Sequence, residues 1–176
     1  ASLPGAGVEY KKMTAAYRRI AAAGVMISDT STGTVRRGCF GSPFHAFYQM
    51  NKADARSMQF GVARLAELYL AAGAKRVYTG FAPVPVVESA EDVTRLEGHR
   101  VRPTDFELLA FHPLGTCAMG SDPRKSVVNF DLRSHDIDNL HIMDASVIPH
   151  SLGVNPQVTI MALAMRAARL LATKLG

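Results

Sequence analysis

The sequence predicts an α+β protein, in which a part with alternating helical and strand patterns is followed by a part rich in glycine and proline. Two observations carry this prediction: long segments repeat apolar residues at helical spacing, and short β-rich runs lie between turn residues. The chain has 176 residues, of which 48% are hydrophobic, and this is enough for a sizeable core. The same composition argues against a disordered chain.

Residues 1–103 alternate helical and strand patterns. The clearest helix covers 54–72, where apolar residues recur every three or four positions from Met58 to Tyr69 and Gly73 provides a typical stop. The other predicted elements are a helix over 9–23, strands over 24–30, 34–35, 44–50 and 76–79, a loop over 82–87 and a short helix over 91–96.

From residue 104 the chain is punctuated by glycine and proline, before it ends in a long predicted helix over 157–175. Short strand-like runs are expected at 127–128 and 140–143. Asn155 is a good N-cap for the final helix, and Pro156 suits its first position.

Charge and cysteine content narrow the functional class. The net charge is +5, but the basic pairs are far apart and form no dense tract with interleaved aromatics, which argues against nucleic-acid binding. No apolar run reaches the roughly 18 residues that span a bilayer.

Cys39 and Cys117 form neither a disulfide framework nor a CxxC pair, so we expect no metal and a cytoplasmic location. The first residues lack the features of a signal peptide and an initiating Met, so we expect part of a longer protein.

The candidate catalytic and binding residues lie in three segments, 111–120, 139–149 and 153–162. His112 precedes a proline, which favours extended backbone, and a histidine on such a loop is an acid/base candidate at neutral pH. The alternative is a loop histidine that only bonds to the backbone. Asn155 stands at a helix start, where unpaired N–H groups favour an anion, although the residue could simply cap the helix.

Taken together in this order, the three segments resemble the C-terminal signature of the glucose–methanol–choline (GMC) oxidoreductases. The matching runs are His-Pro-x-Gly-Thr-Cys-x-Met-Gly from His112, Asp-Ala-Ser-x-x-Pro from Asp144 and Gly-Val-Asn-Pro from Gly153. The resemblance is strong over residues 104–174 and weaker over 9–103. A motif match is a hypothesis until its structural context is known.

The resemblance implies an FAD-dependent enzyme that oxidises an alcohol by hydride transfer to flavin N5. The family's active-site histidine falls on His112 and its partner on Asn155. His112 would take the hydroxyl proton, and Asn155 would bond to the same oxygen. The cofactor-binding residues implied are Asp144, Ala145, Asn155, Pro156, Gln157 and Val158.

The resemblance also implies two parts. Residues 1–103 would form a substrate-domain part, a mixed sheet with covering helices. Residues 104–176 would form an active-site and FAD-contacting part that completes an FAD-binding domain. The glycine fingerprint that grips the FAD pyrophosphate is missing, because Tyr10 stands where a third glycine would follow Gly5 and Gly7. We therefore expect the N-terminal FAD-binding portion of the same protein and a small-molecule alcohol as partners. Alone, the chain is expected to bind FAD poorly, to turn over nothing and to self-associate.

Two other functions stay open from the sequence. The first is a GMC-fold cyanohydrin lyase with structural FAD, and the second is an interaction module that never meets a flavin. We interpret His135 and His141 as structural, His150 as a loop residue without a fixed role, and Cys117 as a small buried hydrophobic residue.

Overall fold

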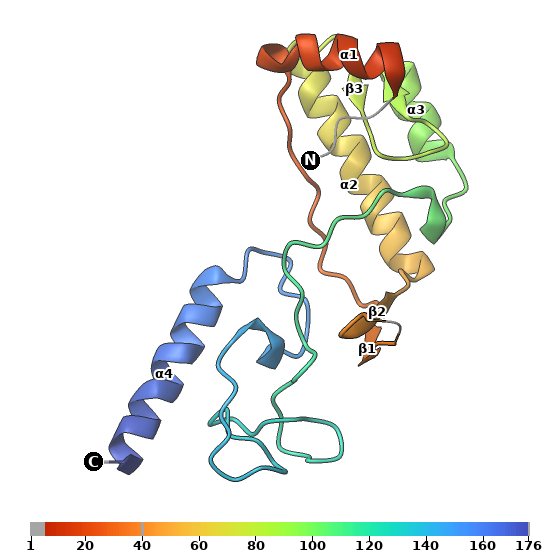
Figure 1. The fold of residues 1–176 in the computed structure, drawn as a ribbon. Helices are drawn as coiled ribbons and strands as arrows, with labels where there is room; N and C mark the ends of the chain where they lie inside the picture. Colours follow the sequence, from red (N-terminus) through yellow and green to blue (C-terminus); the bar gives the residue numbers. More distant parts are fainter. Residues whose placement is uncertain (1–5, 40, 176) are drawn as a thin grey trace. The chain divides into compact units, whose positions relative to one another are not determined.

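A computed structural model describes residues 6–39 and 41–175 of the chain (Figure 1). It contains helices and small antiparallel sheets, which confirms the predicted α+β class. The elements are α1 (Gly7–Ala15), η1 (Tyr17–Arg19), β1 (Gly33–Arg37), β2 (Phe44–Tyr48), α2 (Lys52–Ala71), β3 (Val77–Tyr78), β4 (Val86–Val87), α3 (Ala90–Gly98), η2 (Pro103–Asp105), η3 (Ala145–Val147) and α4 (Gln157–Leu175).

The chain divides into two compact units, each built from two stretches of sequence. Unit 1 contains the described residues up to Met26 together with Ala55–Glu107. Unit 2 contains Ile27–Asp54 together with the described residues from Leu108 onward. The assignment of residues 1–103 to substrate and 104–176 to the flavin stays a prediction.

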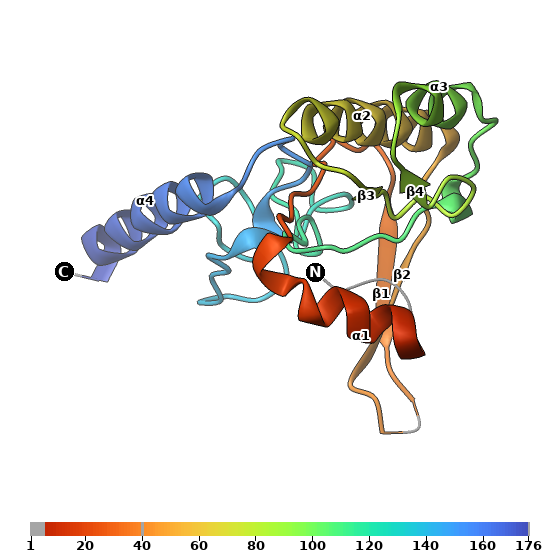
Figure 2. The same cartoon turned by 90° about the horizontal axis from the view of Figure 1, so that it is seen from above.

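Unit 1 is organised around α2. Small residues on one side of α2, Ala63 and Ala66, are completely or almost completely buried, which lets neighbouring segments approach its backbone closely. α3 and the β3–β4 ribbon supply the larger side chains of this core, and Figure 2 shows α2 and α3 on the same side of the ribbon. The core residues besides the two alanines are Phe81, Val84, Val87, Val93 and Leu96.

Buried Gln59 of α2 joins α2 to the end of α3. Its amide Nε2 donates hydrogen bonds to the carbonyl oxygens of Leu96 at 2.7 Å and His99 at 2.8 Å. The last carbonyls of a helix have no partner within it, so this side chain satisfies groups that would otherwise be buried without one. At the other end of α3, the hydroxyl of Ser89 accepts a hydrogen bond from the amide of Asp92.

Unit 2 has less regular structure. The β1–β2 ribbon pairs Gly33 with Tyr48 and Arg37 with Phe44, and nearly all its side chains are exposed. Most of the unit's other described residues before α4 lie in turns and loops. α4 closes a second apolar core formed by Val128, Leu132, Val147, Ile148 and Ala167, with Ile160 and Leu163 packed against it.

The helices predicted over 54–72, 91–96 and 157–175 are confirmed. The strand predicted at 34–35 is also confirmed and is longer than expected, and those predicted at 44–50 and 76–79 are confirmed in shortened form. The first helix is shorter than predicted, because α1 ends at Ala15 and only a 3-10 turn follows. Part of the expected loop over 82–87 forms β4.

Three predicted strands are wrong. Residues 24–30 form no strand, because the amides of Thr30 and Ser31 donate to the carboxylate of Asp54 instead of to a neighbouring strand. Residues 140–143 make only an isolated bridge between His141 and Arg133, and 127–128 likewise forms isolated bridges. The final helix begins at Gln157 as predicted, but Pro156 directly precedes its first residue instead of occupying that position, and the carbonyl of Pro156 accepts a hydrogen bond from the amide of Ile160.

Among the residues that the structure describes, no helix is both long enough and apolar enough to cross a membrane.

Candidate functional site

The loop that follows His112 lies alongside the segment that follows Asp144. The amide of Cys117 donates to the carbonyl of Ser146 at 3.0 Å, and the amide of Met119 donates to the carbonyl of Val147 at 2.9 Å. These backbone bonds join the first and second predicted motifs without help from any side chain. The structure therefore brings together two segments that the sequence separates by about thirty residues.

The backbone conformation at position 115 favours glycine. Its φ of +82° lies in the left-handed region that side chains disfavour. A Cβ atom there would lie 3.4 Å from the carbonyl oxygen of Ile148 and 3.5 Å from that of Pro149, which are ordinary van der Waals contacts. The conformation of the turn, and not lack of space beside the second motif, therefore accounts for the glycine.

The side chain of His112 is exposed, as are those of Phe111 and Pro113 beside it. Within residues 6–39 and 41–175, no group hydrogen-bonds to its imidazole. The alternative of a loop histidine tied to the backbone therefore has no support among these residues. An exposed imidazole without a partner is available to a substrate hydroxyl.

Asp144 has a local structural role at the start of η3. Its carboxylate accepts hydrogen bonds from the amide of Ser146 at 2.8 Å and from the hydroxyl of the same residue at 2.5 Å. These bonds hold the pKa of Asp144 below its ordinary value, so the side chain stays negative at neutral pH. Ala145 is the first residue of η3, directly after this cap.

The third predicted segment leads into α4. Asn155, Gln157 and Val158 have exposed side chains, whereas that of Pro156 is buried. The first amides of this 19-residue helix have no partner within the helix and give its beginning a partial positive charge. This is a chemically suitable place for a developing anion.

α4 and the Asp144 segment share one core. Ile160 and Leu163 of α4 pack against a cluster that contains Val147 and Ile148. Arg166 adds a polar tie, because its guanidinium donates to the carbonyl of Phe130 at 2.6 Å. Backbone bonds therefore join the first motif to the second, and apolar packing joins the second to the helix that follows the third.

Residues 27–31 and Asp54 are neighbours of this region that sequence reasoning missed. The hydroxyl of Ser28 donates to the carbonyl of Ser151 at 3.4 Å, directly beside the third motif. The available signal was the Ser/Thr-rich run that includes Thr30 and Ser31, together with an acidic residue at the start of α2. We predicted part of this run as a strand, so its hydrogen bonds were not sought among side chains.

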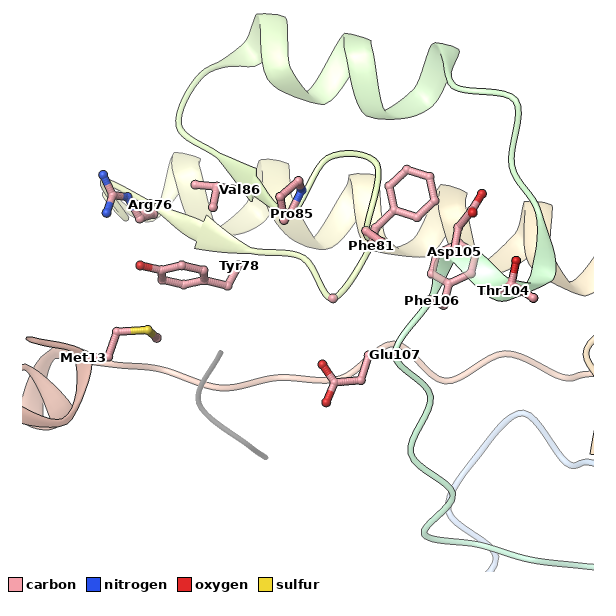
Figure 3. Close-up of a pocket in the computed structure, with 12 residues that line it drawn as sticks. Met13, Arg76, Tyr78, Phe81, Pro85, Val86, Thr104, Asp105, Phe106 and Glu107 are labelled. Atoms are coloured by element: carbon pink, nitrogen blue, oxygen red, sulfur yellow. The ribbon is translucent and has the colours of Figure 1, made fainter. Parts of the chain in front are cut away.

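A cavity of about 590 Å³ lies in unit 1 (Figure 3). Its wall is mainly apolar and includes Met13, Tyr78, Phe81 and Phe106. None of the seven predicted site residues lines it. Asp105, which does, is already engaged, because its carboxylate accepts from the amide of Arg102 at 2.7 Å. The predicted catalytic residues therefore contribute nothing to the wall of this cavity.

In the part of the chain that the structure describes, no three His, Cys, Asp or Glu side chains come together in a way that could hold a metal ion.

The family model for GMC oxidoreductases matches residues 29–164, which is well over half of the chain. The chain belongs to the GMC oxidoreductase family. It is therefore related to oxidoreductases, and members of this family are generally flavoproteins. The match contains all three motifs and extends into the first half of the sequence, where the resemblance was weaker.

Individual GMC proteins match over most of this chain. An uncharacterized GMC-type oxidoreductase of Mycobacterium tuberculosis is 33% identical over 94% of the chain and 26% of its own length. A long-chain-alcohol oxidase of Arabidopsis thaliana is 26% identical over 89% of the chain and 22% of its own length. The chain thus spans about a quarter of the length of these relatives.

A solved structure supports the fold. The crystal structure of pyridoxine 4-oxidase from Mesorbium loti aligns with 82% of this chain and 28% of its own chain, with a TM-score of 0.53 and 22% identity. At that identity, the likeness shows a shared fold and no more.

Proposed function

We propose that this chain is the C-terminal part of an FAD-dependent oxidoreductase that oxidises an alcohol, with His112 as the base. The observation that carries the proposal is the exposed His112 at the start of a loop that is hydrogen-bonded to the Asp144 segment. The family membership and the name of the long-chain-alcohol oxidase add support. We propose the N-terminal, FAD-binding portion of the same protein as the main partner.

His112 acts on the substrate hydroxyl. Its imidazole accepts the proton from the alcohol oxygen, which leaves negative charge on that oxygen while the C–H bond breaks. A positioned histidine contributes about 10²–10⁴-fold to such a step. The loop needs little further order to present the ring, because backbone bonds and Gly115 already fix its course.

Asn155 orients the same oxygen. Its side-chain amide donates a hydrogen bond to the alcohol oxygen and so holds the hydroxyl with its proton directed towards His112. The exposed amide has no hydrogen-bond partner among the described residues, so binding the substrate breaks no existing bond. His112 removes the proton and Asn155 holds the oxygen.

The chain's residues fit one side of a flavin. The exposed beginning of α4, with the amides of Gln157 and Val158 directly after Pro156, offers donors and partial positive charge to an anionic group. We assign the same role to the amide of Ala145 beside Asp144, and Asn155 completes this side. When bound, the flavin supplies the acceptor for the hydride.

The test replaces His112 in the complete protein. We expect His112→Ala to lower the rate of flavin reduction by an alcohol by about 10²–10⁴-fold while the flavin stays bound. His150→Ala is the comparison, because His150 is a second exposed histidine of unit 2. Anaerobic bleaching of the flavin by an alcohol is the readout.

Two results contradict the proposal. Unchanged reduction kinetics in His112→Ala would remove His112 from this role. A flavin in the unaltered protein that no alcohol in a broad panel bleaches, while cyanohydrins are cleaved, would identify a lyase instead.

A further inference from the structure

Asp54 is a buried carboxylate that organises a distant turn. Its exposed fraction is 4%, although it stands at the start of α2 in a largely irregular region. The carboxylate accepts hydrogen bonds from the amides of Thr30 at 2.9 Å and Ser31 at 2.7 Å, and from both of their hydroxyls. Asn51 adds a bond from its side-chain Nδ2 at 3.0 Å. Asp54 thus fixes the backbone and side chains of the turn that contains Thr30 and Ser31.

The charged form of Asp54 suits this arrangement. Burial alone raises the pKa of the carboxyl, but the hydrogen bonds from Ser31 and Thr30 together outweigh it and leave the pKa below its ordinary value. An ionised carboxylate only accepts, and all the partners around it are donors. A neutral group of the same size could not satisfy them all.

The segment that Asp54 holds touches the turn before Asn155. The hydroxyl of Ser28 donates to the carbonyl of Ser151 at 3.4 Å, and the hydroxyl of Ser151 reaches back to the carbonyl of Ile27 at 3.5 Å. A Cβ atom on Gly153 would lie only 3.1 Å from the Cβ of Ser28. Residues 27–28 and 151–153 are therefore in mutual contact.

Gly153 links this contact to the candidate site through the backbone. It has a φ of +66°, which glycine adopts without cost, and it stands two residues before Asn155. The direction in which the chain enters α4 depends on this turn. A shift of the 27–31 segment would move the turn and, with it, the side chain that follows.

We propose that Asp54 is a positioning residue that holds the Gly153–Asn155 turn through the segment from Ile27 to Ser31. This inference rests on the function proposed for Asn155, but the coupling itself is a property of the fold. Asp54 touches no reacting atom and acts only through the packing of Ser28 against Gly153.

The test uses Asp54→Asn in the complete protein, with amide hydrogen exchange and steady-state kinetics as readouts. The asparagine keeps the size but replaces one acceptor oxygen by a donor. We expect exchange to become about tenfold faster both at 27–31 and at 151–155, as local opening of one cooperative element would give. Exchange in α3, which belongs to unit 1, should not change. We expect kcat to fall about tenfold with little change in KM, because a displaced Asn155 affects the step after binding.

Gly153→Ala provides a second test that does not depend on Asp54. The new Cβ would press on Ser28, so exchange at 27–31 should become faster although that segment is not altered. Adding Ser28→Gly should restore slow exchange at 27–31, because it removes the contact. The matched control is Gly73→Ala, which places a side chain at a φ of +92° with no atom within 4 Å and so carries backbone strain alone.

The outcomes separate the coupling from the chemistry. Faster exchange at 27–31 with unchanged exchange at 151–155 in Asp54→Asn would overturn the proposal, and so would a Gly153→Ala effect that Ser28→Gly does not relieve. Faster exchange at both segments with unchanged kcat would support the coupling and contradict the role of Asn155 instead. If Asp54→Asn accelerates exchange throughout the protein, the Gly153→Ala variant with and without Ser28→Gly tests the coupling instead. Relief of the fast exchange at 27–31 by Ser28→Gly would support the proposal, and no relief would overturn it.

Discussion

In unit 1, α2 and α3 bury a continuous apolar surface, whereas in unit 2 long stretches without helix or strand are held by hydrogen bonds from loops. Each unit contains a buried polar side chain that joins distant segments. In unit 1 it is the neutral Gln59, which bonds to carbonyls at the end of α3. In unit 2 it is the charged Asp54, which bonds to amides and hydroxyls.

This difference corresponds to the location of the predicted site residues. All seven predicted site residues lie in unit 2, where polar anchoring fixes the course of the loops. Loops placed by a scaffold are common locations for binding and catalytic residues. Unit 1 is held mainly by apolar packing, while many turns of unit 2 are held by hydrogen bonds.

The largest expected effect is the loss of Phe81 from the core of unit 1. This side chain is fully buried, and its ring lies 5.0 Å from that of Phe106 and 5.5 Å from that of His99. We expect Phe81→Ala to lower the local unfolding free energy of unit 1 by about 3–5 kcal/mol, measured by hydrogen exchange in α2 and α3. Phe130→Ala, at a position that is 60% exposed, should cost less than about 1 kcal/mol. Equal effects would contradict the conclusion that Phe81 stabilises unit 1 through its burial in the core.

Low pH should weaken the stabilisation by Asp54 but not that by Gln59. Because the pKa of Asp54 is lowered in the folded chain, its stabilisation is complete above the ordinary value of 3.8 and is lost as the pH falls through the lower folded value. We expect Asp54→Asn to destabilise unit 2 by about 2 kcal/mol at neutral pH and to match the unaltered chain in strong acid. Gln59→Met should show no such convergence in unit 1. A pH-independent Asp54→Asn effect, measured by hydrogen exchange or circular dichroism, would be inconsistent with a buried ionised anchor.

The smallest effect is expected from two arginines. Arg166 bonds to a backbone carbonyl and to Asp131, so Arg166→Ala should loosen α4 by about 1 kcal/mol. Arg76 forms an ion pair with Glu88, and both side chains are about half exposed, so Arg76→Ala should leave the stability of unit 1 unchanged. Thermal unfolding in low and high salt measures both. An Arg76 effect as large as that of Arg166 would mean that surface ion pairs, not packing, stabilise unit 1.

Local pattern was sufficient for α2, α3 and α4, because apolar spacing and end signals lie within each segment, whereas the helix predicted over 9–23 ends early, at Ala15. The run from Met58 to Tyr69 predicted α2 in this way. It was insufficient for 24–30, where extended backbone finds its partner in the side chain of Asp54 rather than in another strand. Such a bond depends on the tertiary fold, and the spacing of apolar residues in the sequence does not indicate it.

The candidate site shows the same limit. Motif order selected His112 and Asn155, and the structure places both in unit 2. The contact of Ser28 with the Ser151 turn joins residues 123 positions apart, and no spacing rule connects them. The roles of the two catalytic candidates and of the cofactor-binding residues stay predictions.

The interleaved course of the chain limits how family members can be recombined. The backbone passes between the units after Met26, Asp54 and Glu107, and the second passage lies within the first turn of α2. A chimera that exchanges unit 1 therefore needs three crossover points rather than one. A crossover between residues 31 and 54 would take the carboxylate of Asp54 from one parent and its hydrogen-bond donors, Thr30 and Ser31, from another. Libraries of such chimeras should take residues 30, 31 and 54 from the same parent.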